Sequence, residues 1–217
     1  MIIPGIEYRP SLASATGKNR KRNSKPVCVV VHFTGAGVHT RWVKQGKQFG
    51  EKDPFDTAVR IYQRISPAAA HYVVGQNGQC VCTTYEDEVA SHVGSAGHGR
   101  YNGRKWREDA PWWPKKWPEL PSPRDLAAGL LWASGSVNEI SVGIEVTPSA
   151  ENSRPVFSEA ANKQLQYLCK EICKTYGIPY DKYHVFAHCD AHPISRTAKG
   201  ESWDVLKHQW DFSRIAG

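Results

Sequence analysis

The sequence predicts an α/β domain of three layers, in which a mixed central β-sheet has helices on both faces. Apolar, β-branched runs at residues 27–33, 140–146 and 183–189 are typical of strands buried on both faces. Segments with helical spacing lie between these runs, and this alternation indicates a layered α/β fold. One hairpin signal, Asn77-Gly78, adds an antiparallel pair, so the sheet should be mixed.

Length and composition favour one domain with a large insertion. The 217 residues are 40% hydrophobic and 23% charged, as in ordinary globular proteins. We divide the chain into a basic arm over residues 1–26 and a domain over residues 27–217. Residues 95–122 lack periodicity but contain four tryptophans, which argues against disorder. This Trp-rich segment is predicted to be either a substrate-binding lid or a packed insertion.

The elements before the Trp-rich segment follow from local signals. The first apolar run ends at His32 and Phe33 and opens into a glycine loop. The next segment begins with Asp-Pro, a favourable N-cap and first helical position, and its apolar residues recur at helical spacing. The predicted elements are, in order, a strand at 27–33, a helix at 53–66, and strands at 70–76 and 79–85.

The second half of the chain shows equally local signals. Ser158 is a suitable N-cap for a long amphipathic helix, and Gly177 stands at the position where such a helix ends. The predicted elements are a short helix from Ser122-Pro123 to Trp132, a strand at 140–146, a helix at 158–176, a strand at 183–189, and a short helix at 202–210.

The net charge of +7 favours a polyanionic partner such as nucleic acid, an anionic membrane or a phosphate-rich cell wall. Much of the excess positive charge lies in one basic cluster of the N-terminal arm. We prefer to interpret this cluster as part of a solvent-exposed arm. No nucleic-acid-binding motif surrounds it, so no nucleic-acid partner is expected. The cluster consists of Lys18, Arg20, Lys21, Arg22 and Lys25.

Cysteine spacing and hydropathy indicate the cellular compartment of the protein. The six cysteines form no CxxC pair, which favours buried thiols in a reducing compartment over a disulfide framework. No apolar run approaches the length of a membrane span. The first residues lack a basic region followed by an apolar core. We therefore expect a protein that stays in the cytoplasm of the producing cell until it is released or exported.

Two histidines and a glutamate occupy matching positions at the ends of predicted strands. His32 and His188 each follow an apolar run directly, and Glu145 lies near the end of a third run. A lone histidine there is more often a core residue, but two at one sheet edge suggest a metal site. A buried glutamate is costly unless it is used or paired. The set fits zinc-assisted hydrolysis, in which a carboxylate moves protons.

Five segments, in their order along the chain, carry a resemblance to a known family. The chain resembles the zinc-dependent N-acetylmuramoyl-L-alanine amidases that share the peptidoglycan recognition protein fold. The resemblance covers residues 27–210, with 95–122 unmatched. It implies hydrolysis of the amide between N-acetylmuramic acid and the L-alanine of the stem peptide. The segments are VVVHFTGAG, AAHYVVGQNGQCV, ASHVG, NEISVGIEV and FAHCDAHPISRTAKG.

The resemblance implies roles for particular residues. His32 and His188 correspond to the first two Zn²⁺ ligands, and Glu145 corresponds to the catalytic general base. Arg196 stands where the family usually has a lysine that steadies the developing oxyanion; arginine keeps the charge but not the geometry. Ala70 replaces a tyrosine found in some phage members, so Glu145 would act alone.

Further residues are predicted to contact the substrate. His92 matches a histidine that the family places near the substrate cleft. His71 matches a frequent family position, with a packed and hydrogen-bonded strand residue as the alternative. Trp112 and Trp113, in the Trp-rich segment, are also predicted to contact the muropeptide.

One position departs from the family pattern. The third ligand, an Asp or Cys, is expected ten residues after His188, where this chain has Ala198. Alanine cannot bind a metal, and two histidines alone hold zinc weakly. Three explanations stay open: a substitution that removed the ligand, a binding-only relative, or replacement by a nearby donor. The candidate donors are Asp190, His192, Glu201 and Asp204.

The leading hypothesis is therefore a peptidoglycan amidase that acts as a cell-wall lytic enzyme, such as a phage endolysin or an injected toxin, and we expect a monomer. The alternative is a non-catalytic peptidoglycan-binding protein of the same fold, indicated by Ala198. A nucleic-acid-binding protein has only charge in its favour.

Overall fold

The computed structural model describes residues 3–34, 54–64, 69–93, 137–147, 157–188, 210 and 212–217. Its centre is a six-stranded sheet in the order β1-β4-β3-β5-β2-β6. Strands β3, β5, β2 and β6 are mutually parallel, whereas β4 is antiparallel to β3, so the predicted mixed sheet is confirmed. The strands are β1 (Glu7–Tyr8), β2 (Cys28–Phe33), β3 (Tyr72–Val74), β4 (Cys80–Cys82), β5 (Ser141–Val146) and β6 (Val185–Ala187).

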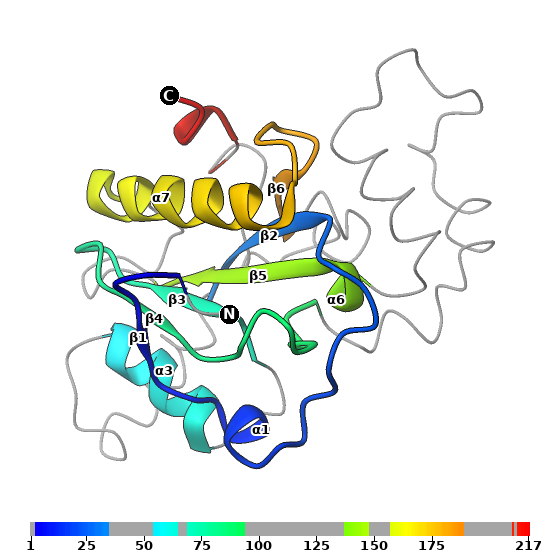
Figure 1. Ribbon diagram of the computed structural model, residues 1–217. Helices are drawn as coiled ribbons and strands as arrows, with labels where there is room; N and C mark the ends of the chain where they lie inside the picture. Colours follow the sequence, from blue (N-terminus) through cyan, green and yellow to red (C-terminus); the bar gives the residue numbers. More distant parts are fainter. Residues whose placement is uncertain are drawn as a thin grey trace, which may run out of the picture.

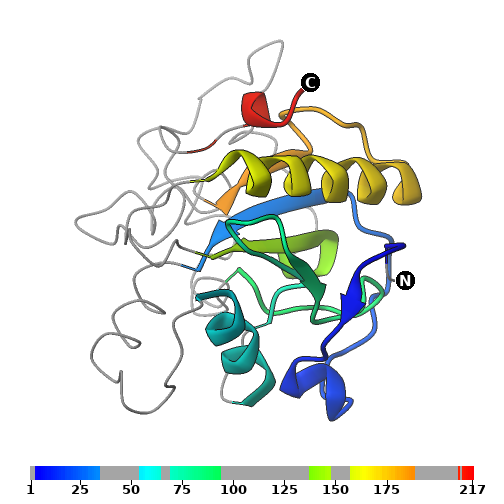
Figure 2. The same cartoon turned by 90° about the vertical axis from the view of Figure 1, so that its left-hand side faces the viewer.

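Helices cover both faces of this sheet, which confirms the predicted three layers. Helix α7 (Glu159–Tyr176) lies along one face and α3 (Pro54–Arg64) lies against the other (Figures 1 and 2). The main core lies between α7 and the sheet and includes Val31, Ile144 and Leu168, all fully buried. On the α3 side, Phe55 and Val59 pack against Val73. Shorter elements are α1 (Leu12–Ala15), α6 (Val137–Ile140) and a 3₁₀ turn at Phe212–Arg214.

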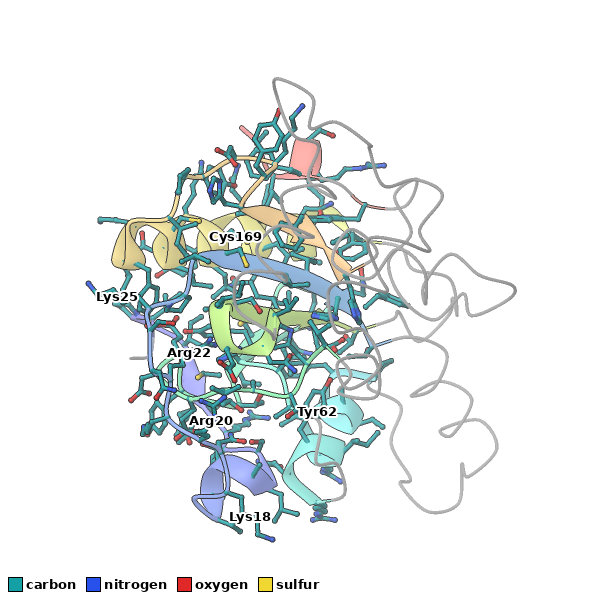
Figure 3. The ribbon with its side chains drawn as sticks, turned by 90° about the vertical axis from the view of Figure 1, so that its right-hand side faces the viewer. Lys18, Arg20, Arg22, Lys25, Tyr62 and Cys169 are labelled. Carbon is teal, nitrogen blue, oxygen red and sulfur yellow. The ribbon has the colours of Figure 1, made fainter. Side chains whose placement is uncertain are left out.

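Helix α7 begins and ends where its sequence signals place it. The Ser158 side chain accepts a hydrogen bond from the Ala161 N–H at 3.0 Å, which caps the first turn. Gly177 follows the last helical residue and adopts the left-handed conformation, with φ +70. A residue with a Cβ would be strained in this conformation. The buried face of α7 includes Cys169, which lies toward the sheet (Figure 3). The five cysteines in the described ranges are free thiols.

The hairpin and the first long helix also follow their sequence signals. Strands β3 and β4 pair antiparallel, and Gly78 between them adopts φ +84. Helix α3 starts at Pro54, the first helical position expected after Asp53, and ends at Arg64. Both strands of the hairpin are shorter than the predicted runs at 70–76 and 79–85, because the pairing covers only three residues on each side.

The N-terminal segment differs from the irregular, solvated arm expected from its composition. Its β1 pairs with β4 and Ile3 belongs to the main core. Figure 3 shows Lys18, Arg20, Arg22 and Lys25 along one side of the molecule. Arg22 turns inward and donates to the Asn138 and Glu139 carbonyls of α6, at 3.0 and 2.6 Å. The solvated-arm expectation is therefore wrong for Arg22.

Two other members of the basic cluster are neutralised by neighbouring carboxylates. Arg20 pairs with Glu139, and the Lys21 ammonium lies 2.8 Å from an Asp87 carboxylate oxygen. Exposed pairs of this kind contribute little to stability, but they reduce the positive potential of the segment. The excess positive charge is therefore less concentrated here than the sequence suggests.

Several predicted elements lie outside the described residues. These are the Trp-rich segment at 95–122, the short helix ending at Trp132, and most of the predicted helix at 202–210. Of the last, Trp210 is described and is buried in the main core. None of the helices in the described ranges is long and apolar enough to cross a membrane.

Candidate active site

Three predicted site residues meet on one face of the sheet, opposite α7. His32 of β2 is the register partner of Glu145 of β5. Neighbouring residues in parallel register point to the same face, so the imidazole and the carboxylate lie side by side. His188 follows β6 directly, and its ring centroid lies 4.3 Å from that of His32. Three adjacent parallel strands thus deliver two imidazoles and one carboxylate to one place.

The two histidines of this row are buried and Glu145 is partly exposed. His32 and His188 are each 1% exposed, which shields both imidazoles from bulk water. Glu145 is intermediate in exposure within a strand that is otherwise buried. One of its carboxylate oxygens, Oε2, is buried, so bulk water reaches Glu145 only in part.

His92 extends the row as a third imidazole. Its Nδ1 lies 2.9 Å from Nε2 of His32, and its Nε2 lies 3.1 Å from Oγ of Ser141. The Ser141 hydroxyl in turn donates to the Val137 carbonyl at 2.6 Å. Both nitrogens of His92 are therefore engaged within the protein.

Gly143 makes room for the His92 ring. A Cβ on Gly143 would lie 2.3 Å from Cγ and 2.5 Å from Nδ1 of His92, far inside contact distance. The ring therefore lies directly on the backbone of β5, two residues before Glu145. A glycine inside a buried strand often marks such a close approach.

A buried asparagine anchors the segment that carries His92. The Asn138 side chain accepts from the Val93 N–H at 2.8 Å and donates to the Val93 carbonyl at 2.9 Å. This pair of bonds replaces the strand partner that the backbone of Val93 would otherwise need. It fixes the chain immediately after His92, and so it restricts where the imidazole can lie.

His71 occupies the neighbouring row, one residue before β3. Its Nδ1 accepts from the Gly143 N–H at 2.9 Å. Its Nε2 lies 2.8 Å from Nη2 of Arg22 and 3.1 Å from the Glu88 carbonyl. His71 is fully buried, and these contacts support the structural alternative over substrate binding.

Burial and neighbouring charge decide the protonation of these imidazoles. Desolvation, with the nearby His32 and His71, holds the pKa of His92 well below its ordinary value. Desolvation, with the Arg22 guanidinium, does the same to the pKa of His71. Burial also lowers the pKa of Arg22 to about 10, which leaves it charged at neutral pH. Both histidines are therefore neutral at pH 7.

The described side chains fit a Zn²⁺ site only in part. In the described part of the chain, no three His, Cys, Asp or Glu side chains are grouped closely enough to hold a metal ion. Imidazole is nevertheless a preferred zinc ligand, and the adjacent rings of His32 and His188 fit two positions of such a site. The family's third position, at Ala198, lies outside the described residues, as do Asp190, His192, Glu201 and Asp204.

The remaining predicted site residues also lie outside the described ranges: Arg196, Trp112 and Trp113. Conversely, sequence reasoning missed Ser141, Asn138 and Arg22 as parts of the site's framework. No local sequence pattern marks these three residues, because their partners are far away in the sequence. Gly143, a glycine inside an apolar strand, is the one local signal of a close contact near them.

Fold and site geometry together define a class of protein. A mixed six-stranded sheet between two helical layers is the peptidoglycan recognition protein-like amidase fold, and the histidine–carboxylate row lies at its strand ends. The family profile Amidase_2, described as N-acetylmuramoyl-L-alanine amidase, matches residues 22–203. The chain therefore belongs to the N-acetylmuramoyl-L-alanine amidase family, and the predicted family is confirmed.

Two solved structures with a TM-score of 0.51 cover almost the whole chain. A selenomethionine derivative of AmpD has a TM-score of 0.51 and 16% identity, covering 99% of this chain and 94% of that chain. A mutant of PlyL has a TM-score of 0.51 and 13% identity, covering 98% of each chain. The Ph2119 endolysin from a Thermus scotoductus bacteriophage has a TM-score of 0.40 and 14% identity, covering 82% of this chain and 80% of that chain. No curated protein matches the sequence.

Proposed function

We propose that this protein hydrolyses the amide bond between N-acetylmuramic acid and the L-alanine of the stem peptide in peptidoglycan. The observation that carries the proposal is the row of His32, Glu145 and His188 on adjacent parallel strands, in a chain of this amidase family. Water adds its hydroxyl to the amide carbonyl carbon, the C–N bond breaks, and the alanine nitrogen leaves as an amine.

Each residue of the row has a distinct task in this reaction. His32 and His188 would hold Zn²⁺, which when bound supplies Lewis-acid polarisation of the carbonyl and activation of water. Glu145 takes a proton from the attacking water and returns it to the departing nitrogen. Its position beside His32 on the neighbouring strand supports this role. Arg196 is proposed to stabilise the negative charge that develops on the carbonyl oxygen.

The Trp-rich segment at 95–122 is the proposed substrate-binding part of the chain. Trp112 and Trp113 would pack against the sugar and peptide of the muropeptide, since aromatic rings offer large apolar surfaces. In this proposal the protein acts as a monomer with bacteriolytic activity, and reaches the cell wall after release or export.

Ala198 sets the expected strength of metal binding. A site with two protein ligands holds Zn²⁺ more weakly than one with three, so we propose that activity requires added zinc. The same residue favours a second candidate function, a peptidoglycan-binding protein that does not cleave. The two functions differ in whether purified cell wall is cut when zinc is in excess.

The test is a zinc titration with cleavage of purified muropeptides as the readout. We expect the native chain to cleave only with excess zinc, and Ala198→Asp to bind zinc at least about tenfold more tightly and cleave at lower zinc. The matched control, Lys25→Met, changes an exposed residue that precedes β2 and should behave as the native chain. Retained binding to cell wall without cleavage by either the native chain or Ala198→Asp would instead establish the binding-only function.

A further inference from the structure

A buried chain of hydrogen bonds runs from the backbone of α6 to His32. It passes from the Val137 carbonyl to the Ser141 hydroxyl, then to the His92 imidazole and finally to Nε2 of His32. The three contacts measure 2.6, 3.1 and 2.9 Å in that order. Ser141 is fully buried and His92 is 8% exposed, so bulk water does not compete strongly for these groups.

The direction of each bond follows from counting hydrogens. A backbone carbonyl can only accept, so the single hydroxyl hydrogen of Ser141 is directed to the Val137 carbonyl. Oγ of Ser141 must then accept from Nε2–H of His92. A neutral imidazole has one N–H, so Nδ1 of His92 is an acceptor. The contact with His32 is therefore a bond donated by Nε2–H of His32.

We propose that Ser141 and His92 are positioning residues that fix the tautomer of His32, with the proton on Nε2 and the lone pair on Nδ1. Nδ1 is then the atom that His32 presents to Zn²⁺. The first part stands on the hydrogen-bond geometry alone, whereas the second rests on the proposed function. Metal-binding histidines commonly depend on a partner at the other ring nitrogen in this way.

Two further contacts keep His92 in its place. The Gly143 backbone supports one face of the ring at a distance that no side chain would permit. Asn138 holds the backbone of Val93 through two hydrogen bonds. The Ser141–His92 pair is thus rigid enough to select one tautomer of its neighbour.

The test uses metal-free protein with ¹⁵N-labelled histidine and long-range ¹H–¹⁵N correlation NMR, which reports which imidazole nitrogen is protonated. We expect His32 to show the Nε2–H tautomer in the native chain. His92→Leu removes the acceptor and should give a mixture of tautomers. His92→Asn keeps an acceptor oxygen near the position of Nδ1 and should restore the Nε2–H form. Ser141→Ala should weaken the preference, whereas Ser141→Thr keeps the hydroxyl and should retain it.

A zinc competition assay on the same variants separates the two parts of the proposal. We expect His92→Leu to weaken zinc binding by about 10- to 100-fold, and His92→Asn to recover most of the loss. An Nδ1–H tautomer of His32 in the native chain, or an unchanged tautomer in folded His92→Leu, would overturn the relay. An Nε2–H tautomer in a native chain that binds no zinc would leave the relay standing and refute the zinc-dependent function.

Discussion

At the residue scale, the contact between Gly143 and His92 gives a sharp prediction. Gly143→Ala places a Cβ 2.3 Å from the His92 imidazole. Hydrogen bonds at both ring nitrogens hold this imidazole in place. We expect the substitution to lower the free energy of unfolding by about 2 kcal/mol, as overpacking of a rigid core does. Chemical denaturation of the metal-free protein measures this loss.

A double-mutant cycle supplies the control for the Gly143 prediction. In a His92→Ala background the ring is absent, so adding Gly143→Ala should cost much less than it does in the native chain. Equal costs in the two backgrounds would show that the clash is not with His92, and the proposed packing of the ring on β5 would be wrong.

The buried histidines predict a loss of stability in mild acid. Burial lowers the pKa of His71 in the folded protein, whereas the unfolded chain has the ordinary value of about 6.5. Below that pH the unfolded state binds more protons, so stability should fall as the pH drops from about 6.5 toward the folded pKa. His92 acts in the same direction.

Urea denaturation of metal-free protein at pH 7 and pH 5.5 tests this sign. In His71→Asn the loss of stability with falling pH should be shallower, by at most about 1.4 kcal/mol per pH unit for the one proton removed. An unchanged slope would mean that His71 does not contribute to the acid sensitivity.

The grouping of candidate site residues was predictable only where the sequence places them at strand ends. The proximity of His32, His188 and Glu145 could be predicted because apolar runs lead into them, and parallel strands bring such ends together. Ser141 and Asn138 could not be found, because their partners His92 and Val93 lie more than forty residues away. Such contacts depend on the packing of the chain and leave no local pattern.

At the scale of elements, Arg22 joins the N-terminal segment to α6 and β5. Its guanidinium donates to the carbonyls of Asn138, Glu139 and Ser141 and to that of Glu86. Arg22→Met removes the donor of four part-buried hydrogen bonds, and we expect a loss of about 3 kcal/mol in the free energy of unfolding.

Lys25→Met is the matched control for Arg22→Met. It removes the same charge from an exposed position in the same segment, and should change stability by no more than about 0.5 kcal/mol. Equal effects of the two substitutions in thermal denaturation would show that net charge matters, and not the buried contacts of Arg22.

Elements were predictable in proportion to how local their signals are. Helix α7 carries its own N-cap, buried stripe and terminal glycine, so its bounds could be predicted from sequence. Strand β1 is two residues long and carries no such pattern; it is a strand only because it pairs with β4. Strand order could not be deduced either, since β2 lies between β5 and β6 through contacts distant in sequence.

At the scale of the whole molecule, topology explains why the site lies where it does. β5, β2 and β6 are adjacent and parallel, so residues from three distant parts of the chain reach one sheet edge. α7 covers the opposite face, whereas on the His32 face α3 packs against Val73 of β3. The family profile, which spans residues 22–203, includes all three strands and therefore the whole row.

The central claim is that this row cleaves the bond between N-acetylmuramic acid and L-alanine. Mass spectrometry of purified peptidoglycan, after incubation with the native chain and excess zinc, tests it most directly. We predict release of stem peptides with a free N-terminal L-alanine, and at least a hundredfold less release by Glu145→Gln, about the contribution of a general base. The absence of that product from the native chain, or its equal release by Glu145→Gln, would contradict the account.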